Sequence, residues 1–187
     1  QDLLQALGAQ ADEFIAVRHD IHRHPEMGYM EYRTSDLVAE QLEKFGYAVT
    51  RGLGGTGVVG QLRRGVGGKT LGLRADMDAL PIWEANKVPY KSKNDGVMHA
   101  CGHDAHSAIV LGAGLAISRL ISEEGLTPAL GVRLIFEPGE ENVPGGAVHV
   151  INEGWLEWHR NGTHTGTFNI AANSWLHVFA GTHSMAD

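Results

Sequence analysis

The stretch TLGLRADMDALP (Thr70–Pro81) sets the expectation for the fold. Its first six residues, Thr70 to Ala75, are mostly apolar and predict a buried strand. Asp76 and Asp78 follow directly, at the position where open α/β sheets place functional groups. Aspartate is also common in ordinary turns, so this stretch alone leaves a capped turn and a functional pair equally open.

A second apolar strand, predicted over Val132–Phe136, also runs into acids, in the segment EPGEE at 137–141. Between the two strands we predict a helix that is capped by Asp104 and ends near Ser122. Strands that alternate with helices predict an α/β fold with a mostly parallel sheet and helices on both faces. The strand ends, and the acids with them, then converge on one edge of the sheet.

The rest of the chain adds shorter predictions. We expect a helix over 2–22, a helix capped by Thr34 or Ser35 that ends at Gly46, and a helix from 145–146 through Asn152. We expect strands at 47–50, 58–62 and 176–180, the last of which leads to His183, and a turn at 65–68. Residues 155–174 are polar and irregular, which predicts a long loop or insertion within one catalytic domain spanning 1–187.

The glycine-rich run at 52–57 resembles a phosphate-binding loop only superficially. It lacks the Gly-Lys-Ser/Thr ending and precedes a strand instead of a helix. We interpret it as a connection between strands.

Composition excludes several classes of function. The formal net charge is −7 and the pI is about 5.8, which argues against a nucleic-acid partner. The chain shows no apolar run of about 18 residues and no signal-peptide pattern, so we expect no membrane partner. Its single cysteine, Cys101, excludes an internal disulfide, and a cytoplasmic location is the resulting expectation.

The segment HACGHDAH (His99–His106) concentrates metal-binding chemistry. Cys101 and His103 are two residues apart, so both side chains can face one side of an extended or turning segment and begin a site for Zn²⁺ or a similar ion. Glu140, Glu141 and His183 would complete it and leave one acid beside the metal. A structural zinc site is the alternative, although such sites usually use four Cys or His ligands without a spare acid. A merely solvated pair of glutamates is another.

Several motifs together resemble the M20 metallopeptidase/amidohydrolase family, in its branch of aminoacylases, hippurate hydrolases and auxin-conjugate hydrolases. The matching segments are IHRHPEMGYMEYRTS (21–35), LRADMDALPI (73–82), SKNDGVMHACGHDAHSAIVLGA (92–113), IFEPGEE (135–141) and GGAVHVINEG (145–154). The resemblance runs from the first helix to about residue 154 and resumes near His183.

The resemblance implies a zinc-peptidase-like catalytic domain that binds two divalent ions, Zn²⁺ or Mn²⁺. The metal ligands would be Cys101, His103, Glu141 and His183. Glu140 would be the general base and acid, and Asp78 would orient a ligand or catalytic group. The implied reaction is cleavage of the amide bond of an N-acyl amino acid or small peptide by metal-activated water. Asp76 and His106 lie in the same motifs without a definite role, and His99 and His106 are expected to support the site without binding metal.

The chain also departs from the family pattern. Family members are longer and carry a separate lid or dimerisation domain and a further metal-binding histidine, neither of which we find here. The spacing from Glu141 to the last ligand is long, so His159, His164 and His177 remain alternatives to His183. Glu137 stands where the family often has glutamine and is expected to shift the pKa of its neighbours.

Three readings therefore stay open: an active amidohydrolase, an incomplete domain that binds metal without turnover, and a structural zinc module that collapses on chelation. The sequence leaves the acyl and amino-acid specificity, the metal and the oligomeric state undetermined.

Overall fold

The computed structural model describes residues 8, 10–62, 69–123, 125, 130–155, 159–160 and 163–164. Its helices are α2 (Ala11–Arg23), α3 (Tyr32–Lys44), α4 (His103–Ser122) and α5 (Ala147–Asn152). Its strands are β1 (Ala48–Leu53), β2 (Gly57–Leu62), β3 (Lys69–Asp76), β4 (Leu130–Glu137), β5 (His159–Arg160) and β6 (Thr163–His164). The predicted turn at 65–68 and strand at 176–180 lie outside the described residues.

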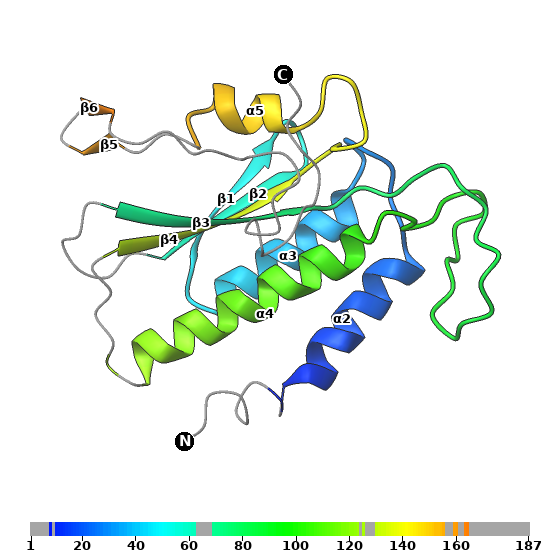
Figure 1. The fold of residues 1–187 in the computed structure, drawn as a ribbon, viewed down its shortest axis with the longest axis horizontal. Helices are drawn as coiled ribbons and strands as arrows, with labels where there is room; N and C mark the ends of the chain where they lie inside the picture. The colour runs from blue at the N-terminus through cyan, green and yellow to red at the C-terminus, as the bar shows by residue number, and fades with distance from the viewer. Residues whose placement is uncertain are drawn as a thin grey trace.

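Four strands form one sheet in the order β1-β2-β4-β3 (Figure 1). β3 and β4 are parallel and in register, from Lys69 opposite Leu130 to Asp76 opposite Glu137. The other two pairings, β1 with β2 and β2 with β4, are antiparallel. The α/β class is therefore confirmed, whereas the described part of the sheet is mixed instead of mostly parallel. The turn at 54–56 is too short for the crossover that a parallel β1–β2 pair would need.

Helices cover both faces of this sheet, as predicted. α3 and α4 lie on one face, α2 packs against α4, and α5 lies on the opposite face (Figure 1). Two apolar clusters fill these interfaces. The larger lies beneath α3 and α4 and includes Val38, Leu42, Val58, Leu73, Val110, Leu111, Leu134 and Phe136, while the smaller lies beneath α5 and contains Leu53, Val59, Ile135 and Val150.

The start of α3 differs from the prediction. Thr34 and Ser35 lie inside the helix, and the N-cap position belongs to Glu31, whose side chain makes no capping bond. The carboxylate of Glu26 instead accepts hydrogen bonds from the backbone amides of Arg33 and Thr34, at 2.9 and 2.8 Å. An acid five residues before the cap position thus satisfies the amides that a local cap would normally take.

Helix α4 also begins without the predicted cap. Its N-cap is Gly102, whose φ of +89° is one that glycine adopts without strain. Asp104 lies in the first turn, and its buried carboxylate bonds His22 Nδ1 at 2.9 Å and accepts from Arg18 Nε at 3.1 Å. Asp104 therefore ties α4 to α2 instead of capping its own helix.

By length and composition α4 is apolar enough to cross a membrane, although no such run was expected from the sequence. Its packing against α2, α3 and the sheet gives this apolarity an ordinary cause, because a core helix of a globular domain can be equally long and apolar. A glycine of α4 allows a close approach to the sheet. A Cβ added at Gly114 would lie 2.5 Å from Leu134 Cδ1 in the core.

This packing yields a prediction on stability. Gly114→Ala is expected to be less stable than Gly112→Ala by about 1–3 kcal/mol, the usual cost of overpacking a core. Gly112 is the matched control, because a Cβ there meets Phe14 only at an ordinary 3.5 Å and both changes gain the same helix propensity. Urea unfolding of both variants measures the difference, and equal stabilities would contradict the described contact.

Candidate metal centre

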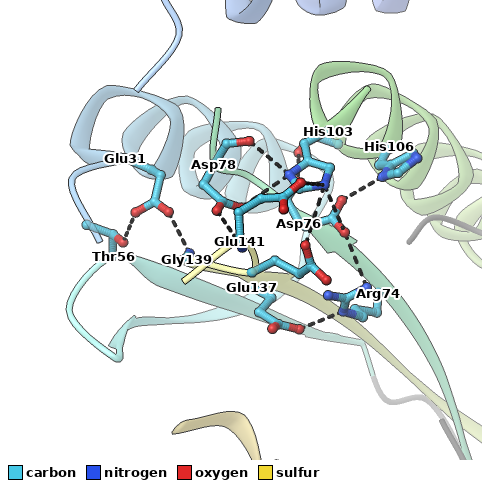
Figure 2. Close-up of polar contacts among 12 residues, drawn as sticks. Glu31, Thr56, Arg74, Asp76, Asp78, His103, His106, Glu137, Gly139 and Glu141 are labelled. Carbon is cyan, nitrogen blue, oxygen red and sulfur yellow. Dashed lines mark hydrogen bonds and ion pairs between the residues drawn. The ribbon is translucent and has the colours of Figure 1, made fainter. Parts of the chain in front are cut away.

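The predicted acids meet at the carboxyl ends of β3 and β4. Because these strands are parallel and in register, Asp76 lies opposite Glu137, and the segment 137–141 runs beside Asp78. The N-terminal turn of α4 brings His103 and His106 to the same edge (Figure 2). The structure thus brings together Asp76, Asp78, Cys101, His103, Glu140 and Glu141.

His103 lies at the centre of this group and is fully buried. Its Nδ1 lies 2.8 Å from the backbone oxygen of Asp78 and 3.2 Å from Asp78 Oδ1. Since both neighbours only accept hydrogen bonds, Nδ1 carries the proton, which leaves Nε2 as the atom able to bind a metal. Nε2 faces three carboxylate oxygens, at 3.5 Å from Asp76, 3.9 Å from Glu140 and 4.0 Å from Glu141.

Two sets of potential ligand atoms share His103. One set is Cys101, His103 and Glu141, and the other is Asp76, His103 and His106; within each, the ligand atoms lie within 4.8 Å of one another. His106 Nδ1 lies 2.6 Å from Asp76 Oδ1. The second oxygen, Asp76 Oδ2, is buried and has no hydrogen bond within the described parts of the chain, although Arg74 Nη1 is 3.3 Å away. Such an oxygen beside a thiol, an imidazole and further carboxylates fits a divalent cation.

The charges of the site point to the same conclusion. Burial lowers the pKa of His103, but its bond to Asp78 and the charges of Asp76, Asp78 and Glu140 outweigh burial and raise this pKa to about 9. Burial, Glu141 and the other acids raise the pKa of the Cys101 thiol to about 12. Burial and Asp76 raise the pKa of Glu140 to about 7. The protein alone therefore holds more negative charge here than it neutralises, and a divalent cation would offset it.

The comparison with protein families places these residues in a known group. The model for peptidase family M20/M25/M40 matches residues 72–185, more than half of the chain. The chain belongs to this family. The matched region includes both aspartates, the segment with Cys101 and His103, and the glutamate pair.

Named relatives agree with the M20 assignment. The chain is 47% identical to a hippurate hydrolase of Campylobacter jejuni over 78% of its own length, and 49% identical to thermostable carboxypeptidase 2 of Saccharolobus solfataricus over 76%. It spans 36% of the length of each, about a third. Among solved structures, a dinuclear metal-binding M20 peptidase of Bacillus subtilis matches 83% of this chain, with a TM-score of 0.72 and 36% identity, over 41% of its own length.

The last predicted ligand of this M20 domain is not described. His183 and His177 lie outside the described residues. His159 and His164 occupy the short strands β5 and β6, where their backbones pair with each other. The choice among these four histidines therefore stays a prediction.

Two further residues of the site, Arg74 and Glu31, were not predicted from the sequence. Arg74 Nε donates to Glu137 at 2.6 Å, so the charge that Glu137 brings is matched by a guanidinium. Burial lowers the pKa of Arg74, but Glu137 and Asp76 outweigh it and raise this pKa overall. Glu31 is fully buried and contacts the segment after β4 (Figure 2). It lies within the motif at 21–35, but no local pattern identifies its distant partner.

The burial of Glu31 predicts a pH dependence of stability. Burial raises the pKa of Glu31 above its ordinary 4.5, and hydrogen bonds from Thr56 and Gly139 offset only part of this. The folded chain therefore holds this proton more tightly than the unfolded chain, and the contribution of Glu31 to stability falls as the pH rises above about 4.5. Glu31→Gln cannot ionise, so its stability relative to the unaltered chain should increase from pH 5 to pH 8 in urea unfolding.

Glu123→Gln, at an exposed position that pairs with Arg119, controls for the loss of one surface carboxylate. A difference between Glu31→Gln and the unaltered chain that stays constant with pH would contradict this prediction.

Proposed function

We propose that this M20 domain is a metal-dependent amidohydrolase that cleaves the amide bond of N-acyl amino acids or small peptides. One observation carries the proposal. Glu141 lies in a metal-ligand group with Cys101 and His103, while the carboxylate of its neighbour Glu140 lies outside that group, 3.9 Å from the same imidazole. A carboxylate that is placed beside a metal-ligand group without belonging to it can accept a proton from water.

The proposed cofactor is a pair of divalent ions, Zn²⁺ or Mn²⁺. Cys101, His103 and Glu141 would hold metal together with a later histidine, for which we propose His183. Paired metal binding is supported by the two ligand groups around His103 and by the dinuclear relative from Bacillus subtilis. When bound, such ions polarise a carbonyl oxygen and lower the pKa of water.

Glu140 and Asp78 would have different roles in the reaction. Glu140 accepts the proton of the attacking water and later donates it to the leaving amine, so that the amide C–N bond breaks to give a carboxylate and an amine. Asp78 holds His103 in one tautomer and bonds the backbone amide of Glu141 at 2.9 Å. Asp78 thereby orients two proposed ligands at once.

Hydrolysis assays test the proposal. The purified chain is incubated with Mn²⁺ or Zn²⁺ and with a panel of benzoyl-glycine, N-acetyl amino acids and dipeptides, the substrate classes suggested by relatives named hippurate hydrolase, N-acyl-L-amino acid amidohydrolase and carboxypeptidase. We expect release of free amino acid that stops when a chelator removes the metal. Metal binding without turnover on any substrate would refute the amidohydrolase proposal and favour an incomplete domain, and a chain that binds no metal would refute both.

A further inference from the structure

We propose that Glu31 is a positioning residue that holds the segment 137–141, here called the acid loop, in the conformation that presents Glu140 and Glu141. The effect on turnover rests on the proposed function, whereas the effect on metal affinity does not.

Glu31 joins three segments that are distant in sequence. Its Oε1 accepts a hydrogen bond from the backbone amide of Gly139 at 2.7 Å, and its Oε2 accepts one from the Thr56 hydroxyl at 2.5 Å (Figure 2). Thr56 belongs to the turn between β1 and β2, and Gly139 to the acid loop. Both carboxylate oxygens are therefore used, and neither makes a capping hydrogen bond to the helix that Glu31 begins.

This use of the side chain separates Glu31 from an ordinary helix cap. Glu31 occupies the N-cap position of α3, yet it makes no side-chain capping bond. Glu26 supplies that function by accepting from the amides of Arg33 and Thr34. A buried carboxylate is costly unless it is hydrogen-bonded, and the Glu31 carboxylate bonds Thr56 and the acid loop in addition to the nearby backbone amides of Tyr29 and Glu31 itself.

Gly139 is the point at which the acid loop turns. Its φ of +56° lies in the left-handed region, and an added Cβ would come within 2.7 Å of the Tyr29 ring. Its carbonyl accepts hydrogen bonds from the amides of Asn142 and Gly146, both at 3.2 Å. Because the Gly139 amide is held by Glu31 and its carbonyl by the following turn, the peptide group that enters Glu140 has a fixed direction.

The two amides on either side of Glu140 are held in the same way. Glu31 accepts from the amide of Gly139, and Asp78 accepts from the amide of Glu141. Two buried carboxylates from different segments thus hold the backbone on both sides of the proposed base. Asp78 also contacts His103, whereas the side-chain partners described for Glu31, Thr56 and Gly139, are not proposed ligands.

The test compares Glu31→Ala with Glu31→Gln. Alanine removes both acceptors, whereas glutamine can accept from the Gly139 amide through its oxygen and donate to the Thr56 hydroxyl through its nitrogen. We expect Glu31→Ala to lower kcat and Co²⁺ affinity by about 10–100-fold, the usual range for residues that orient metal ligands, with KM nearly unchanged. Glu31→Gln should restore both quantities.

Glu26→Ala is the matched control. It removes a half-buried acid from the same connection between α2 and α3, and the hydrogen bonds of that acid go to Arg33 and Thr34 instead of the acid loop. It should lower thermal stability and leave kcat and Co²⁺ affinity unchanged. If Glu31→Ala fails to fold, Thr56→Val replaces it, because this change releases one oxygen of Glu31 and should lower both quantities to a smaller extent.

The outcomes are distinct. Normal kcat and Co²⁺ affinity in folded Glu31→Ala, or in Thr56→Val where Glu31→Ala does not fold, would refute the positioning role, as would a loss in Glu31→Ala that Glu31→Gln does not restore. Equal losses of kcat in Glu26→Ala and Glu31→Ala would show that Glu31 only stabilises the fold and has no separate positioning role. If the unaltered chain hydrolyses nothing, the proposed function fails, and Co²⁺ affinity alone decides the role of Glu31.

Discussion

Glu140→Gln is expected to lower kcat by about 10²–10⁴-fold, the contribution typical of a positioned general base, while the variant still binds metal. Glutamine keeps the shape of the side chain but cannot accept a proton. The carboxyl of Glu140 has its pKa raised to about 7 by burial and by Asp76, and it lies 3.9 Å from His103 Nε2. Steady-state hydrolysis and metal content, measured on the same preparation, check the two halves of this prediction.

Glu123→Gln makes the same chemical change at an exposed site and should behave as the unaltered chain. Normal turnover by Glu140→Gln would remove this residue from the mechanism. If the variant instead loses its metal, Glu140 is a ligand, and the roles proposed for the two adjacent glutamates must be exchanged.

The sequence predicted those parts of the fold that short-range patterns determine. The apolar runs before Asp76 and Glu137 identified β3 and β4. The antiparallel pairings were missed because strand-and-helix alternation was extended to β1 and β2, which a short turn connects. Pairing direction depends on the length of the connection as well as on the strands themselves.

Contacts between distant segments explain most of what the sequence did not predict. Asp104 has the residue type and position of a helix cap, yet His22 and Arg18 take its carboxylate from another helix. Glu31 bonds an amide 108 residues further along the chain. Residue type and spacing identify which groups can bind metal or a proton, but the side chains that hold those groups become visible only when the segments pack together.

His103→Ala is expected to abolish stabilisation by metal. A ligand present at 100 times its dissociation constant stabilises the folded state by about 2.7 kcal/mol, and a chelator removes this gain. His103 belongs to both ligand groups, so its loss should make thermal unfolding insensitive to added Mn²⁺ or chelator. The metal-free variant should also be less stable than the metal-free unaltered chain, because Asp76 and Asp78 lose a buried partner.

Two further variants separate these effects. His24→Ala removes an imidazole that pairs with Asp20 away from the site, and should keep the full response to metal. Cys101→Ser conserves size while replacing a soft sulfur ligand by a weaker oxygen, so it should weaken metal binding without the stability loss expected for His103→Ala. A His103→Ala chain that metal still stabilises would show that the ion binds elsewhere, and the centre described at the ends of β3 and β4 would then need a different explanation.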